Sequence, residues 1–155
     1  MSLSVTTYYC LNCTFKQVDF VHWGVREYLL PNDARVPMEW SLGWCEQCKG
    51  LAAVEIPCTT ELSEAIRRTA PEFSQLPPRA TRCLACGSGQ VTAPLLTSGL
   101  TWSNRKIPAP TGFIHPNCGG ELWRMQDGFR VALRQSIKTY TIDGEFIEQV
   151  FDDRL

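Results

Sequence analysis

Apolar and polar positions alternate with a period of two along much of the chain, and this pattern predicts mainly β-strands. Strand-like runs of this kind cover residues 15–21, 51–56, 122–125, 129–133, 137–142 and 145–151. Asp127-Gly128 and Asp143-Gly144 each lie between two such runs, and an Asp-Gly pair in that position is a strong hairpin signal. We therefore expect a β-rich fold with a C-terminal β-hairpin.

One segment has the three-to-four-residue spacing of a helix instead. Leu62 and Ile66 lie on one apolar face, Thr59 or Thr60 is a suitable N-cap, and a proline follows the last turn. Residues 59–78 are therefore predicted to form a short helical connector between two units.

Composition and charge exclude several classes of protein. The chain has 155 residues, of which 44% are hydrophobic, so it can bury a core and is not disordered throughout. It has no apolar run long enough to span a membrane, and residues 1–7 lack the pattern of a secretory signal, so a cytoplasmic protein is expected. The net charge of -1 argues against a generally basic, phosphate-binding protein.

The eight cysteines are the unusual feature of this composition. Six form three Cys-x-x-Cys pairs, and a His-x-x-Cys sequence supplies a fourth pair. The eight candidate metal ligands are Cys10, Cys13, Cys45, Cys48, Cys83, Cys86, His115 and Cys118. Two-residue spacing folds the backbone into a tight turn, here called a knuckle, from which both side chains reach one ion at about 2.3 Å. Two knuckles complete a tetrahedral site.

This pattern resembles the zinc-ribbon superfamily, in which two knuckles at the ends of β-hairpins hold one zinc ion. The best matches are Cys83-Leu-Ala-Cys86-Gly87 and His115-Pro-Asn-Cys118-Gly119-Gly120, in which a glycine follows the second ligand. Gly50 follows Cys48 at a distance of two residues, whereas Thr14 follows Cys13. The resemblance covers roughly residues 8–57 and 80–125. It implies a small, metal-stabilised, mainly β fold of two zinc-ribbon-like units with two Zn²⁺ per chain.

The simplest assignment of ligands follows the order of the chain. One site takes Cys10, Cys13, Cys45 and Cys48, and the other takes Cys83, Cys86, His115 and Cys118. The corresponding domains are residues 1–58, the connector 59–78, and residues 79–155 with the C-terminal β-hairpin. An interleaved assignment, in which the first knuckle joins the third, would require a more entangled chain.

Other uses of the cysteines stay open at this point. Eight cysteines could form a disulfide framework, and an all-cysteine site could hold iron instead of zinc. Cys58 stands alone in the sequence. It is expected to be a buried apolar side chain, with two alternatives: a ligand that replaces His115, or a reactive thiol.

Motifs for catalysis are missing, so an enzyme with a small-molecule substrate is not expected. Near-neutral charge and five tryptophans favour a non-catalytic adaptor that binds a protein partner. The alternative is a nucleic-acid-binding zinc ribbon associated with transcription or RNA. Its most suitable contact residues are Trp102, Arg105 and Lys106, and a second basic face could include Arg67 and Arg82.

Overall fold

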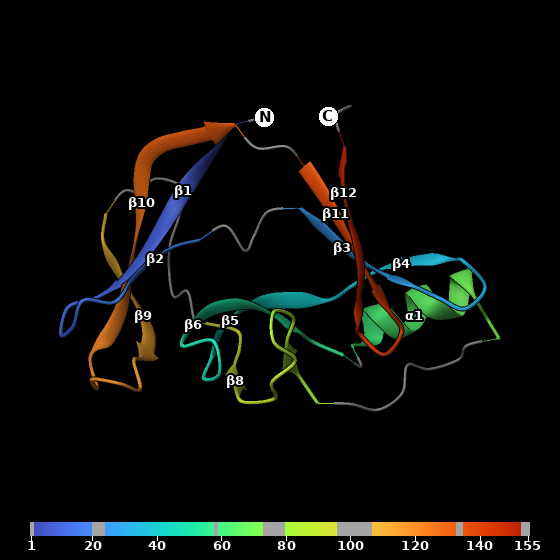
Figure 1. The fold of residues 1–155 in the computed structure, drawn as a ribbon, viewed down its shortest axis with the longest axis horizontal. Coiled ribbons are helices and arrows are strands. Elements are labelled where there is room, and N and C mark those ends of the chain that lie inside the picture. Colours follow the sequence, from blue (N-terminus) through green and yellow to red (C-terminus); the bar gives the residue numbers. More distant parts are fainter. Residues whose placement is uncertain are drawn as a thin grey trace.

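The computed structural model describes residues 2–19, 24–57, 59–72, 80–95, 107–132 and 135–152 (Figure 1). This part of the chain is mainly β, as predicted, and contains three four-stranded sheets and one short helix. No helix in these segments has the length and apolar character needed to cross a membrane.

The first sheet joins the N-terminal strands to strands near the C-terminus. Its order is β2-β1-β10-β9 and its pairs are antiparallel. The strands are β1 (Ser2–Cys10), β2 (Lys16–Asp19), β9 (Ala109–Ile114) and β10 (Glu121–Ala132). Figure 1 shows β1 (blue) lying beside β10 (orange), although they come from opposite ends of the sequence.

The turn predicted at Asp127-Gly128 is wrong, because β10 continues through it. Ser4 faces Arg130 and Thr6 faces Gln126, so residues 127–129 of β10 lie opposite one residue of β1. The pairing with β1 resumes beyond this point. The extra residues are therefore accommodated as a bulge within a continuous strand and do not reverse the chain.

The second sheet has the order β7-β6-β5-β8, with the β5–β6 hairpin at its centre. The strands are β5 (Trp40–Cys45), β6 (Gly50–Glu55), β7 (Arg82–Cys83) and β8 (Val91–Thr92). Every residue of β6 is buried, as expected for a central strand covered on both faces. The strand predicted over residues 51–56 is thereby confirmed.

The third sheet has the order β12-β11-β3-β4 and contains one parallel pair, β3 with β11. Its strands are β3 (Val25–Leu29), β4 (Arg35–Pro37), β11 (Gln135–Thr141) and β12 (Phe146–Asp152). β11 and β12 form the predicted C-terminal hairpin, and Gly144 in its turn has a φ of 77°. Glycine adopts this conformation at little cost.

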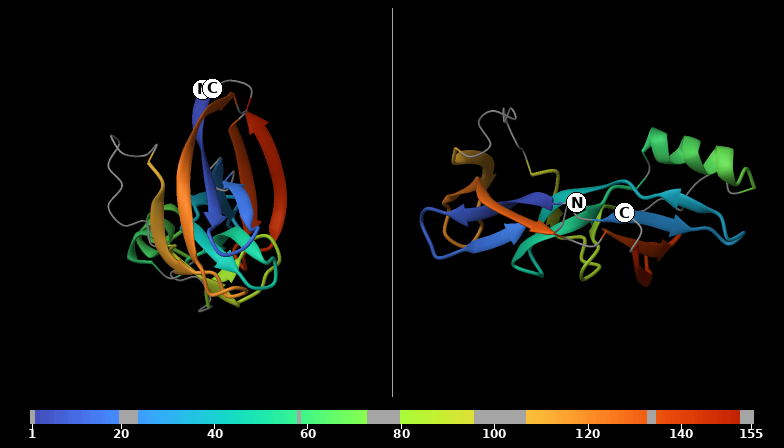
Figure 2. Two further views of the ribbon diagram at one scale, coloured as in Figure 1. Left: turned by 90° about the vertical axis from the view of Figure 1, so that its left-hand side faces the viewer. Right: turned by 90° about the horizontal axis from the view of Figure 1, so that it is seen from above.

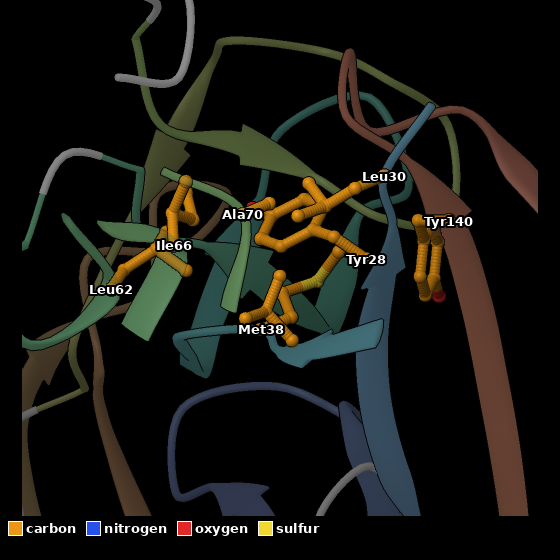
Figure 3. Packing of buried hydrophobic residues seen from close by; sticks show 8 residues of the cluster. Tyr28, Leu30, Met38, Leu62, Ile66, Ala70 and Tyr140 are labelled. Carbon is orange, nitrogen blue, oxygen red and sulfur yellow. The ribbon is translucent and has the colours of Figure 1, made fainter. Parts of the chain in front are cut away.

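The predicted connector helix is α1 (Thr60–Thr69). The Thr59 side chain caps it by accepting a hydrogen bond of 3.1 Å from the Leu62 N–H, as expected. Leu62 and Ile66 are buried in the largest described core cluster, where the helix packs against side chains from β3, β4 and β11 (Figure 3). The labelled members of the cluster are Tyr28, Leu30, Met38, Leu62, Ile66, Ala70 and Tyr140.

Each sheet takes strands from both sides of the predicted connector, so the expected boundaries at residues 58 and 79 do not separate one sheet from another. Side chains also join the sheets. The Gln17 amide on β2 makes two hydrogen bonds with the Leu51 backbone on β6, of 3.0 and 2.8 Å. The Glu55 carboxylate on β6 accepts from Tyr28 on β3 and from Arg82 on β7.

Candidate metal sites

The eight predicted ligands gather into two groups of four, but the knuckles do not pair in sequence order. One group contains Cys10, Cys13, His115 and Cys118, and the other contains Cys45, Cys48, Cys83 and Cys86. The first knuckle meets the fourth and the second meets the third, so the assignment of the first two knuckles to one site is wrong. The interleaved alternative is wrong as well. The arrangement is nested. The knuckles of the all-cysteine site lie, in sequence, between the two knuckles of the site that contains His115.

Strand pairing explains this arrangement. Cys10 ends β1 and faces Leu122 of β10, so the turn after β1 lies beside the turn that joins β9 to β10. Those two turns carry the four residues of the outer site, which are Cys10, Cys13, His115 and Cys118. The inner site (Cys45, Cys48, Cys83 and Cys86) forms differently. Its second knuckle lies at the turn of the β5–β6 hairpin, and its third knuckle lies in the segment that runs from β7, beside β6, to β8, beside β5.

The outer site has the dimensions of a tetrahedral metal site. The Cys10 and Cys118 sulfurs are 3.3 Å apart, and His115 Nδ1 lies 3.4 Å from Cys13 Sγ and 3.3 Å from Cys118 Sγ. Metal–ligand bonds of about 2.3 Å to sulfur and about 2.0 Å to nitrogen separate the donor atoms by about 3.5–3.8 Å. The four side chains therefore fit one central ion.

The inner site has a similar geometry with four sulfurs. Cys45 Sγ lies 3.5 Å from Cys86 Sγ, and Cys48 Sγ lies 3.8 Å from Cys83 Sγ. A disulfide needs a sulfur–sulfur distance of about 2.05 Å. The seven cysteines in the described segments are free thiols, which favours metal ligation over the disulfide framework.

Backbone N–H groups surround the sulfurs. The amides of Asn12, Cys48, Ala85 and Gly120 each donate to a ligand sulfur at 3.4 Å. Each knuckle thus points one amide at its first ligand or, in the fourth knuckle, at Cys118. Such contacts orient the ligands and stabilise the thiolate form that binds a metal.

The residue after the second ligand has a left-handed backbone in three of the four knuckles. Gly87 and Gly119 have φ values of 76° and 68°, as the sequence pattern predicts. In the second knuckle, however, the residue in this conformation is Lys49, with a φ of 54°, and not Gly50. Lys49 directly follows the second ligand, as Gly87 and Gly119 do, and this position identifies the left-handed residue better than the presence of a nearby glycine. A lysine there carries a conformational cost that glycine avoids.

Protonation of the thiols depends on their surroundings. Burial raises the pKa of Cys83 and of Cys48, whereas a hydrogen bond from the Ser88 backbone lowers the pKa of Cys86. A metal ligand must be a thiolate. Metal binding at the inner site is therefore expected to release protons and to strengthen as the pH rises.

An aromatic cluster covers the histidine of the outer site. The His115 ring is 2% exposed and lies 5.0 Å from the Phe15 ring and 4.9 Å from the Trp44 ring, measured between centroids. His115 Nδ1 faces the cysteines, and Nε2 has no hydrogen-bond partner among the described residues. Trp44 directly precedes Cys45, so this side chain contacts the outer site while its backbone leads into the inner one.

Several predicted residues lie outside the described segments: Cys58, Trp102, Arg105 and Lys106. Their predicted roles are not tested. Arg82, which was expected on a basic face, instead forms an ion pair of 2.9 Å with the fully buried Glu55.

Comparison with protein-family models, curated proteins and solved structures gives no match. The assignment of two metal sites rests on the chain's own geometry. Each site brings together four donor atoms that all lie within 4.8 Å of one another.

Proposed function

We propose that the protein is a non-catalytic adaptor, stabilised by two zinc ions, which binds a partner protein through the edge strand β12. The donor sets, three cysteines with one histidine and four cysteines, are those of structural zinc. Catalytic zinc keeps a position open for water, whereas each of these groups already supplies four protein ligands. Three of the four knuckles lie at hairpin turns, which also agrees with the resemblance to zinc ribbons.

Metal analysis tests the identity of the ions. Protein purified without added metal is expected to contain two zinc ions per chain, with eight cysteines counted as thiols after denaturation. Iron at the all-cysteine site, or fewer than eight thiols, would contradict the proposal. Removal of the ions by a strong chelator should unfold the sheets, because each ion joins two segments that are distant in sequence.

The observation that carries the choice of a protein partner is the exposed edge of the third sheet. β12 is the outer strand of that sheet, and Figure 2 (left) shows it in red at the edge of the molecule. Its side chains Phe146, Ile147, Val150 and Phe151 are 57, 42, 49 and 55% exposed. An edge strand presents unpaired backbone groups, and soluble monomers usually protect such an edge with charge or a bulge. Exposed apolar side chains along an edge strand are instead typical of strand-addition sites.

Charge favours a partner with basic residues over a second copy of this chain. Glu148 on β12 is exposed, as is Glu145 directly before the strand, and Glu148 reaches Arg35 only at 3.5 Å. Antiparallel pairing of two copies in a register centred on Glu148 would place the two Glu148 carboxylates opposite each other, and like charges that face each other across strands destabilise a sheet. We therefore infer that the occupant is an extended segment of another protein with apolar and basic side chains.

Matched variants test this surface. Ile147→Lys places a positive charge on β12, whereas Ile107→Lys makes the same change at an exposed position away from that strand. A partner recovered by the natural protein should be retained by Ile107→Lys, lost by Ile147→Lys, and joined to β12 in a crosslinking map. Equal recovery by both variants would exclude β12 as the interface.

Two further outcomes would overturn the choice of partner. Loss of every partner after nuclease treatment would favour the nucleic-acid alternative. A dimer in sedimentation experiments that Ile147→Lys dissociates, and Ile107→Lys does not, would identify a second copy as the occupant of β12.

A further inference from the structure

A cavity of about 310 Å³ lies where the three sheets meet, on the inner-site side of the molecule. Its lining residues are Gln17, Val18, Arg26, Cys48, Leu51, Ala52, Ala53, Leu84, Ala85, Lys138 and Tyr140. This volume is at the small end of the range of about 300–1,000 Å³ that is typical of ligand pockets.

Two positive side chains lie side by side in the lining of the cavity. Arg26 on β3 and Lys138 on β11 are direct partners in the parallel ladder, so they project from the same face of the sheet. No carboxylate is among the described residues that line this cavity. Like charges at adjacent positions are unfavourable unless an anion compensates them. Burial, together with repulsion by the Arg26 charge, lowers the pKa of Lys138.

Arg26 is held in a fixed position. Its guanidinium lies 3.9 Å from the centre of the Trp40 ring, and it also hydrogen-bonds with Tyr140. Asp19 on β2 interacts with the Arg26 charge and offsets part of it. Lys138 makes no ion pair with any described residue, so one positive charge in this lining is left uncompensated.

Apolar residues also line the cavity. Leu51 and Ala52 on β6 and Leu84 in the third knuckle contribute small aliphatic surfaces. The Gln17 amide is already used by the Leu51 backbone, so it does not compete for a ligand. The cavity thus combines two cationic side chains with an apolar lining, as ligand pockets with a few convergent polar groups do.

We propose that this cavity binds a small organic anion, with an oxyanion head group against Arg26 and Lys138 and an apolar body against Leu51, Ala52 and Leu84. Guanidinium and ammonium groups both bind carboxylate and phosphate oxygens. The ligand is bound and not transformed, so the inference adds a binding site to the proposed adaptor and does not depend on its partner.

The competing explanation is that the two cations compensate the thiolates of the inner site, since Cys48 also lines the cavity. Four thiolates around a divalent ion carry a net negative charge. The two explanations differ in their consequences. Compensation predicts that loss of Lys138 weakens metal retention and that added anions do not bind.

The test is an NMR titration of the metal-loaded protein with benzoate, acetate and inorganic phosphate, at constant ionic strength set with chloride. Saturable shifts are expected at the amides of Ala52 and Lys138, with benzoate binding more tightly than acetate because of the apolar lining. Phosphate binding more tightly than benzoate would assign a phosphate head group, and the reverse order a carboxylate with an apolar body.

Matched variants complete the test. Lys138→Gln should weaken binding about tenfold, the effect of one charged partner, whereas Lys16→Gln, an exposed lysine on β2, should leave it unchanged. An unaltered backbone NMR spectrum away from the cavity shows that Lys138→Gln remains folded. Non-saturable shifts, equal effects of both variants, or faster metal loss from Lys138→Gln without any anion binding would each overturn the proposal.

Discussion

Arg82→Met is expected to lower the free energy of unfolding substantially, because Arg82 neutralises a buried carboxylate. Glu55 is fully buried, and Arg82 donates to it at 2.9 Å and also to the Asp143 carbonyl. Removing one partner of a buried ion pair costs about 3–5 kcal/mol. Arg82 is 25% exposed and Tyr28 still donates to Glu55, so the lower end of that range, about 3 kcal/mol, is expected.

Urea denaturation of the metal-saturated protein, followed by far-ultraviolet circular dichroism, measures this change. Arg67→Met, at an exposed position on α1, is the control and should change stability by no more than about 0.5 kcal/mol. The double variant Glu55→Gln/Arg82→Met should be more stable than Arg82→Met alone by about 1 kcal/mol, because the unpaired charge is gone. A loss below about 1 kcal/mol in Arg82→Met would refute the structural role and return Arg82 to the candidate nucleic-acid contacts.

Two further predictions concern the knuckles. Lys49→Gly should stabilise the metal-saturated protein by about 0.5–1 kcal/mol, because it removes the strain of a left-handed lysine. Thr14→Gly, at the corresponding position without a positive φ, should destabilise the protein in the same urea assay. Stabilisation by both variants or by neither would contradict the role of φ. Gly120→Ala should release one of the two ions faster to a chelator, because its Cβ would lie 2.8 Å from Cys10 Sγ, whereas Gly89→Ala, with 3.9 Å to its nearest neighbour, should release both ions at the natural rate. Equal release rates in these two variants would show that the outer site has room to adjust.

Local signals in the sequence identified much of the fold and the eight residues that the structure gathers into two candidate metal sites. The two-residue spacing of cysteines places both ligands on one turn, the Thr59 cap begins the helix, and Asp143-Gly144 forms its hairpin. Each of these features depends on a few neighbouring residues. For that reason it can be recognised without knowledge of the rest of the chain.

Long-range pairing could not be predicted in the same way. Cys13 and His115 are 102 positions apart. The loop between them is about three times longer than the loop from Cys13 to Cys45 that the assignment in chain order requires, but closing it costs only about 1 kcal/mol more. The pairing of β1 with β10 outweighs that difference in free energy, and the spacing of the cysteines in the sequence does not indicate which strands pair. The left-handed Lys49 was missed because it depends on its place in the turn, and the sequence pattern pointed to Gly50 instead.

The nested pairing of knuckles is the central claim, and cadmium-113 NMR tests it most directly. In protein loaded with cadmium-113, scalar coupling links each metal resonance to the side-chain protons of its own ligands. One resonance is expected to couple to Cys10, Cys13, His115 and Cys118, and the other to Cys45, Cys48, Cys83 and Cys86. A resonance coupled to both Cys10 and Cys45 would contradict the account.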